Sequence, residues 1–317
     1  MIIMEQKDIK KHTQEKIEED LQRIGVSDGD TLFLRVSYKA IGSIEGGPIT
    51  FIKALENVVG ENGTIIMTAF PAKYVRQLRW LHRSKCYSIS NLPKPTTGIL
   101  PTLALTLPET RISHKLEFPF VVIGKLSKYL TENHVHDKYG YWLLQEAIEQ
   151  YGCKCLRIGG EPFVGSTHIA FDDVFREKGY YQTKLKYGLY LEENGKKKWY
   201  DTPNTVFCRS GFAKYVKDIV NVSKINDGEV GSGYAILTDM RKSLAKEREL
   251  FRKDIRITLC DNPDCLDCRT SFTFSDETNW IYFKRQLRNV FSSKRKNAMH
   301  NIYSLIMKLL YGIPVQG

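Results

Sequence analysis

The chain has 317 residues, of which 42% are hydrophobic, and a formal net charge of +11. This length suits one large α/β domain or two ordinary ones, and the hydrophobic content can fill a substantial core. The N-terminus becomes charged directly after Met1–Met4, unlike a secretory signal, and no run of about 18 apolar residues could cross a membrane as a helix. Seven cysteines, an odd number without regular spacing over most of the chain, indicate the reducing cytoplasm.

The positive charge is concentrated near the C-terminus. Residues 278–317 contain seven basic residues and no acidic one, so this segment carries +7 and the preceding residues carry only +4. The body is therefore mildly basic. Neither part contains a recognisable nucleic-acid-binding module, so we expect no nucleic acid as a partner.

The first part of the chain alternates predicted helices and strands. In chain order we predict a helix over 13–23, a strand over 31–36, a helix over 49–58 and a strand over 64–70. Ile17, Leu21 and Ile24 recur at helical spacing, which indicates an amphipathic first helix. Glycine-containing turns separate these elements, and this βαβ punctuation favours a mostly parallel sheet.

The segment 37–47 joins the first predicted strand to the second predicted helix. It is rich in Gly and Ser, and it offers backbone N–H groups at a helix N-terminus, where a phosphate-bearing ligand can bind. It matches neither a Walker P-loop nor a Gly-x-Gly-x-x-Gly loop. By spacing alone it is weak support for a binding site.

The middle of the chain begins with an irregular polar segment, residues 71–95, which is either a substrate lid or a surface excursion. After it we predict a strand over 120–124, a helix over 141–151 and a strand over 153–158. Gly159 and Gly160 end this last strand.

His168 lies where the last predicted strand gives way to a helix, which is where α/β proteins place their ligands. Ser166 or Thr167 can cap that helix, with Asp172 and Asp173 near its positive end. A histidine at such a position can accept a proton near neutral pH, with a nearby carboxylate to orient it. The alternative is a capping histidine at an ordinary junction.

Seven short motifs, in this order, resemble the aminoglycoside 3-N-acetyltransferase family. They are Gly29–Leu32, Ser37–Gly42, Gly46–Gly47, Gly63–Met67, Thr97–Gly98, Arg111–His114 and Ser166–His168. The resemblance covers about residues 11–255, and each motif alone is weak. It implies a three-layer α/β/α sandwich around a mostly parallel sheet, with acetyl transfer from acetyl-CoA to an amine.

The resemblance also implies roles for single residues. His168 matches the family's histidine, the base that acts on the acceptor amine. The family's acid falls here on Phe171, so Asp172 becomes the candidate, with Asp173 in reserve. The resemblance places the following residues at the CoA donor site: Arg35, Ser37, Tyr38, Gly42, Thr97, Gly98, Arg111, Ser113 and His114. For His114 both a structural and a catalytic role stay open.

Acetyl transfer sets chemical requirements that the residues can meet. An imidazole that removes a proton from the attacking amine is typically worth about 10²- to 10⁴-fold in rate, and a carboxylate beside it raises its basicity. The oxyanion that forms on the thioester needs donors, either loop N–H groups or the hydroxyl of Ser37 or Thr167. We expect acetyl-CoA as the co-substrate and no metal.

Charge bears on the acceptor. Aminoglycosides are polycations whose sites need carboxylates, whereas this body is mildly basic and has Arg35 where the family has a histidine. We therefore expect a nucleotide-linked amino sugar as the acceptor, in surface-polysaccharide or glycoconjugate synthesis. The alternatives are an aminoglycoside-antibiotic acetyltransferase and a non-catalytic CoA-binding relative.

Residues 256–317 lie beyond the predicted catalytic domain, residues 11–255, as a helical C-terminal appendage. Cys260, Cys265 and Cys268 either bind a metal or are free thiols in a turn-rich segment. The tail over 280–311 interleaves apolar and basic residues. It forms either a helix on an anionic membrane surface or a helix packed on the body or on a second subunit. The expected location is the cytoplasm or its membrane surface.

Overall fold

The computed structural model describes most of the region between residues 11 and 262. The described residues are 11–70, 77–78, 86–88, 95–136, 138–160, 165–178, 187–201, 209–262, 265, 283–284, 287–288, 298–299, 301–302 and 306. Most of the predicted lid, residues 71–95, and most of the predicted tail helix lie outside them. Both interpretations therefore stay predictions.

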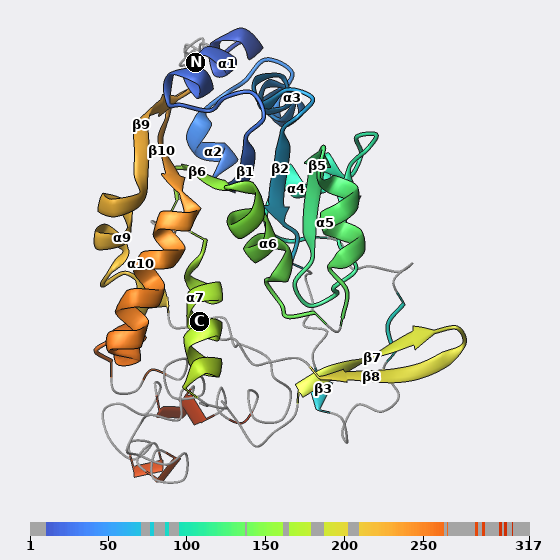
Figure 1. Cartoon of the computed structure of the whole chain (residues 1–317), viewed down its shortest axis with the longest axis vertical. Coiled ribbons are helices and arrows are strands. Elements are labelled where there is room, and N and C mark those ends of the chain that lie inside the picture. The colour runs from blue at the N-terminus through green and yellow to red at the C-terminus, as the bar shows by residue number, and fades with distance from the viewer. Residues whose placement is uncertain are drawn as a thin grey trace, which may run out of the picture.

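A seven-stranded sheet is the centre of the described structure, with the strand order β4-β5-β2-β1-β6-β10-β9 (Figure 1). Its strands are β1 (Thr31–Val36), β2 (Thr64–Thr68), β4 (Arg111–Ile112), β5 (Phe120–Gly124), β6 (Lys154–Ile158), β9 (Lys224–Val230) and β10 (Gly233–Asp239). The central strand β1 runs parallel to β2 and to β6, and the four outer pairings are antiparallel.

The predicted α/β class is confirmed, and the parallel part of the sheet is its centre. β9 and β10 are joined by the short turn at Gly231 and Ser232, and a turn of that length can join only antiparallel strands. β4 and β5 are likewise neighbours in the chain and pair antiparallel. The alternation of strands and helices in the sequence therefore corresponds to the three inner parallel strands, because the connections between these strands contain helices.

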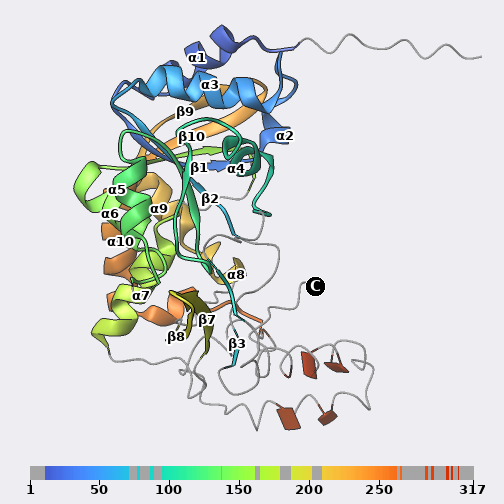
Figure 2. The same cartoon turned by 90° about the vertical axis from the view of Figure 1, so that its right-hand side faces the viewer.

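Helices cover both faces of the sheet, which gives the predicted three layers (Figure 2). One face carries α1 (Gln14–Arg23), α2 (Tyr38–Ile41), α3 (Pro48–Val59) and α4 (Ile99–Ala104). The other carries α5 (Ser127–Asn133), α6 (Trp142–Tyr151), α7 (Thr167–Glu177), α8 (Arg209–Phe212), α9 (Val216–Ser223) and α10 (Met240–Lys253). Each layer buries its own apolar cluster against the sheet.

The strand β1 illustrates why both faces are covered. Leu32 and Leu34 belong to the cluster under α1 and α3, whereas Phe33 between them belongs to the cluster under α6 and α7. Successive side chains of a strand point to opposite faces, so a strand buried on both sides reads as a continuous apolar run. Leu32, Phe33 and Leu34 form that run at the centre of β1.

A smaller sheet contains β3 (Gln77–Leu78), β7 (Tyr187–Glu193) and β8 (Lys196–Asp201). In Figure 1 the β7–β8 hairpin extends away from the central sheet. Leu189 and Leu191 of β7 pack on Leu116, in the segment between β4 and β5. The hairpin is thus anchored to the body by a small apolar cluster of its own.

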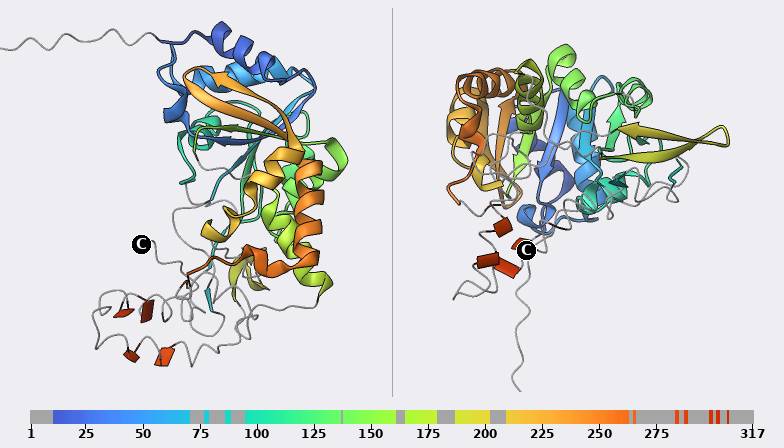
Figure 3. Two further views of the ribbon diagram at one scale, coloured as in Figure 1. Left: turned by 90° about the vertical axis from the view of Figure 1, so that its left-hand side faces the viewer. Right: turned by 90° about the horizontal axis from the view of Figure 1, so that it is seen from below.

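The helix α10 lies beside α7 on the second face, which the views in Figure 3 also show. A short 3-10 turn, η2 (Ile255–Thr258), follows α10, and Ile255 is buried in the same cluster. The predicted boundary after residue 255 falls inside this turn. The division into two domains stays a prediction.

Candidate active site

A cavity of about 620 Å³ opens where the three parallel strands end. Its lining comes from the carboxyl ends of β1, β2 and β6 and from the start of α4. In open α/β sheets, ligands bind at this edge, where the strand order reverses on either side of the first strand. β1 is such a strand here, since β2 and β6 flank it.

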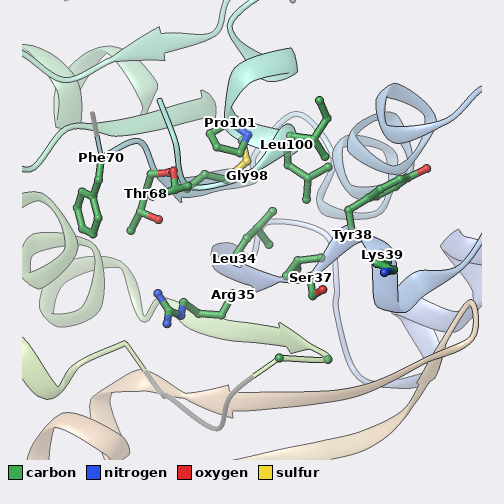
Figure 4. Close-up of a pocket in the computed structure, with 16 residues that line it drawn as sticks. Leu34, Arg35, Ser37, Tyr38, Lys39, Thr68, Phe70, Gly98, Leu100 and Pro101 are labelled. Atoms are coloured by element: carbon green, nitrogen blue, oxygen red, sulfur yellow. The ribbon is translucent and has the colours of Figure 1, made fainter. Parts of the chain in front are cut away.

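Figure 4 shows how this large cavity is lined. Ser37, Tyr38 and Lys39, which follow β1, face the start of α4 across the opening. The guanidinium of Arg35 extends toward the end of the cavity formed by Thr68 and Phe70 (Figure 4). The described lining residues include two basic side chains and no carboxylate.

Glycines allow the backbone to approach closely at this cavity. Gly159, at the end of β6, has φ +59°, and a Cβ there would lie 2.4 Å from the Cβ of Ala40. Gly98 precedes α4 with φ +120°. Larger residues at either position would strain the backbone, and at Gly159 they would also displace α2.

A second cavity, of about 290 Å³, adjoins the first. Arg35, Thr68 and Phe70 line both. The remaining lining of the small cavity is mostly apolar and aromatic: Phe33, Tyr141, Leu144, Gly165, Thr167, His168 and Phe212. The two cavities therefore meet at one short wall, and a group bound in each could come into contact there.

His168 is brought into the small cavity by the first turn of α7. Its ring stacks on Tyr141, with centroids 4.7 Å apart and planes at 6°, and it meets Phe212 edge-on at 6.0 Å. Burial, reinforced by the positive charge of Arg35, lowers the pKa of His168 to about 3. The ring is therefore neutral at physiological pH, which is the form able to accept a proton.

The carboxylates predicted to assist His168 point toward arginines. Asp172 is one helical turn after His168 and forms an ion pair with Arg176, with N–O 2.7 Å. Asp173 pairs with Arg248 of α10 at 2.5 Å. The expected rise in the basicity of His168 is not observed, because burial and Arg35 act in the opposite direction. The role of Asp172 stays a prediction.

The predicted donor-site residues divide into two groups. The first group lines the large cavity: Arg35, Ser37, Tyr38, Thr97 and Gly98. The second group is not among the described residues that line either cavity: Gly42, Arg111, Ser113 and His114. Their contact with the donor is therefore not supported by the described cavities.

Two members of the second group have structural contacts of their own. Ser113 is fully buried, accepts a hydrogen bond from the Phe120 N–H, and shares one with His134. Arg111 belongs to the edge strand β4 and lies 3.6 Å from Glu132. The motif Arg111–His114 therefore begins in the edge strand of the sheet, away from the cavities.

Glu247 of α10 is a candidate functional residue that the sequence reasoning missed. It is fully buried and accepts hydrogen bonds from the hydroxyls of Ser166 (2.6 Å) and Thr167 (2.5 Å), directly before His168. Burial raises the pKa of Glu247 to about 7 even though both hydroxyls favour the charged form. Met240, Leu244 and Phe251 recur at helical spacing on α10, and Glu247 falls on the same buried stripe. A carboxylate on an apolar stripe was the available signal.

The predicted thiol cluster is only partly described. Cys260 and Cys265 are among the described residues, and Cys268 lies outside them. Within the described part of the chain, no group of three His, Cys, Asp or Glu residues could hold a metal ion. The absence of a metal stays a prediction.

None of the described helices is both long and apolar enough to cross a membrane.

Known proteins resemble this chain in sequence. The model of the family described as aminoglycoside 3-N-acetyltransferase matches residues 33–252. An aminoglycoside N(3)-acetyltransferase III from Salmonella sp. is 31% identical over 159 residues, which is 47% of this chain and 56% of that protein. The chain thus spans about half the length of curated relatives such as this one.

Solved structures share the fold. The YokD protein from Bacillus subtilis superimposes with a TM-score of 0.66 at 21% identity, covering 78% of this chain and 95% of that one. A structure described as AAC-IIIb binary with CoASH gives a TM-score of 0.62 at 20% identity, covering 77% and 97%. At these identities the likeness shows the fold alone.

Proposed function

Since the chain belongs to the aminoglycoside 3-N-acetyltransferase family, we propose that it transfers the acetyl group of acetyl-CoA to an amine of a small acceptor that contains an amino sugar. The observation that carries this proposal is the junction of the two cavities. Arg35, Thr68 and Phe70 line both, and His168 lines the smaller one beside them. A donor in one cavity and an acceptor in the other would meet at that junction, next to a neutral imidazole.

The large cavity fits acetyl-CoA as the donor substrate. CoA is polyanionic, and the charged side chains among the described lining residues are Arg35 and Lys39. Apolar side chains such as Met67 and Leu100 can contact the long pantetheine arm. A CoA complex is known for the neighbour AAC-IIIb, which supports this assignment by analogy.

The reaction that follows is a direct acyl transfer. The lone pair of the amine attacks the thioester carbonyl carbon, and the carbon–sulfur bond breaks. The amine nitrogen loses a proton to the imidazole of His168, and the imidazolium returns this proton to the departing CoA thiolate, so that amide and CoA thiol are formed. Arg35, at the junction, is placed to stabilise the negative charge that develops on the carbonyl oxygen.

A base with a pKa of about 3 can serve this reaction. After attack, the nitrogen is bonded to a tetrahedral carbon and carries a positive charge, which makes its protons far more acidic than those of the free ammonium. The imidazole must be neutral and close, and strong basicity matters less. Proximity of the reacting groups supplies much of the remaining acceleration.

Two acceptors are candidates, and they differ in charge. The first is an aminoglycoside, which the names of the family and of its curated relatives favour. The second is a nucleotide-linked amino sugar, which is anionic. It is favoured by the small cavity, where Arg35 is the charged lining residue and no carboxylate is found among the described lining residues. A polycation near Arg35 would be repelled.

A single screen tests the proposal. Release of the CoA thiol from acetyl-CoA is measured with aminoglycosides such as kanamycin and gentamicin and with nucleotide-linked amino sugars, each at low and high salt. Turnover with either class supports the enzyme. The salt dependence of acceptor binding identifies the class, because screening weakens attraction between Arg35 and an anionic acceptor. Tight acetyl-CoA binding without thiol release for any amine would refute catalysis and leave a CoA-binding protein.

A further inference from the structure

We propose that Glu247 is a positioning residue for this transfer. It holds the hydroxyl protons of Ser166 and Thr167, and so orients the first turn of α7, which presents His168 to the acceptor. The inference rests on the proposed function for its catalytic meaning. Its structural part concerns the orientation of His168 and can be measured without any acceptor.

The contacts of Glu247 bring α10 onto the start of α7. One carboxylate oxygen accepts from Ser166 at 2.6 Å and the other from Thr167 at 2.5 Å. The hydroxyl-bearing residues are about 80 positions away in the chain, and all three side chains are buried. His168 follows Thr167 directly, and both line the small cavity. A shift of this turn would therefore move the imidazole.

The side chain of Ser166 does not cap α7, although Ser166 is the N-cap residue. It is the N-cap of α7, where a serine hydroxyl commonly accepts a hydrogen bond from the helix backbone, worth about 1 kcal/mol. Here the side chain makes no capping bond and donates to Glu247 instead. The Ser166 hydroxyl thus makes a long-range hydrogen bond to Glu247 in place of a local capping bond that would stabilise α7. This exchange favours a role in positioning over one in helix stability.

Burying a carboxyl at this place is costly. Burial raises the pKa of Glu247 to about 7, although both hydroxyls favour its charged form. Tyr215, which precedes α9, is the other titratable group coupled to it among the described residues. An apolar side chain would fill the same stripe of α10 without this penalty. A buried titratable group with a shifted pKa beside a cavity is a candidate functional residue.

The hydrogen bonds also determine what Thr167 can do. Its only hydroxyl proton is engaged with Glu247, so its oxygen can accept but cannot donate elsewhere. Thr167 is thereby removed from the candidate oxyanion donors, which leaves that role to Arg35, to the hydroxyl of Ser37 or to backbone N–H groups. On the opposite side, a Cβ on Gly165 would lie 2.6 Å from Phe33 of β1. The turn is thus held between β1 and α10.

The experiment compares Glu247→Leu and Glu247→Gln with Glu249→Leu as the matched control. Glu249 lies on the same helix, is exposed, and pairs with Lys246. Glutamine can still accept from one hydroxyl, whereas leucine can accept from neither. We expect Glu247→Leu to lower kcat by about 10²-fold, since misplacement of a catalytic group by about 1 Å costs that much. The kcat of Glu247→Gln should be at least tenfold higher than that of Glu247→Leu.

Two further readouts separate positioning from mere folding. KM for acetyl-CoA should stay within about twofold of wild type, because Glu247 is not part of the large cavity. The ¹⁵N resonances of the His168 ring, recorded without substrates, should shift in Glu247→Leu and in Thr167→Val but stay unchanged in Glu249→Leu.

The outcomes are distinct. Unchanged His168 resonances in Glu247→Leu, or a kcat within twofold of wild type, would overturn the inference. A loss of kcat, acetyl-CoA affinity and thermal stability together, without recovery in Glu247→Gln, would overturn it in favour of a structural role. If wild-type protein turns over no amine, the proposed function fails, and the resonances still decide whether Glu247 orients His168.

Discussion

Replacing Lys115 by Met should destabilise the protein strongly, because it leaves a buried carboxylate without its cation. Lys115 and Glu117 form an ion pair at 3.1 Å with side chains that are 1% and 2% exposed, and His136 lies 3.6 Å from the same carboxylate. Burial raises the pKa of Glu117, but the nearby His136 imidazole and the charge of Lys115 outweigh it and bring this pKa from 4.5 to about 2.

The magnitude follows from that shift. A displacement from 4.5 to about 2 corresponds to about 3 kcal/mol of stability carried by the charged form. Because the pKa is depressed on folding, this stability is fully present above pH 4.5 and is lost as the pH falls toward 2. Removing one partner of a buried pair costs about 3 to 5 kcal/mol, so a loss in this range is expected for Lys115→Met at pH 7.

Urea unfolding at several pH values measures the effect. In Lys115→Met, burial should raise the pKa of Glu117, so its deficit relative to wild type should shrink as the pH falls from 7 to 4. Lys246→Met, which breaks a solvent-exposed pair with Glu249, is the control and should cost less than about 1 kcal/mol. A deficit below 1 kcal/mol for Lys115→Met, or one that grows on acidification, would refute the reasoning.

The remaining predictions concern catalysis. His168→Gln should lower kcat by about 10²- to 10⁴-fold with acetyl-CoA affinity kept within a few-fold, and near-normal turnover would remove His168 from the mechanism. In wild type, titration of His168 should cause no fall of kcat between pH 8 and 5, because the pKa of His168 lies at about 3. Arg35→Leu should raise that pKa. A fall of wild-type kcat in this pH range that disappears in His168→Gln would contradict the pKa of about 3. Asp172→Asn should reduce kcat less than His168→Gln does, and a larger loss in Asp173→Asn, measured in the same assay, would transfer the supporting role to Asp173.

Much of the central architecture could be predicted from local patterns. Leu32, Phe33 and Leu34 bury apolar side chains on both faces of β1, as the centre of a covered strand should, and His168 follows the glycines that end β6. Patterns of this kind depend on residues close together in the chain. The position of Ser37, Tyr38 and Thr97 at the large cavity follows from the same cause, since each lies just beyond a strand or just before a helix of the central fold.

Other features depend on contacts between distant residues, which local patterns do not identify. The apolar stripe of α10 indicates that Glu247 is buried, but Glu247 meets Ser166 only because α10 packs beside α7. Arg111, whose donor-site role stays a prediction, lies away from the described cavities for the complementary reason. Its motif is continuous, but β4 pairs with β5 at the edge of the sheet, and β5 and β2 lie between β4 and β1. The antiparallel flanks of the sheet were missed for another reason, because no strand was predicted at the positions of β4, β9 and β10.

The wall shared by the two cavities has a thermodynamic consequence. Arg35, Thr68 and Phe70 line both cavities, so in the proposed reaction each would contact the donor on one side and the acceptor on the other. Any reorientation of these side chains when one substrate binds alters the surface offered to the other, so the two binding equilibria are linked. Linkage is reciprocal: the factor by which acetyl-CoA changes the acceptor's dissociation constant equals the factor by which the acceptor changes that of acetyl-CoA. Substitution of a shared residue should therefore alter this coupling factor as well as the two separate affinities.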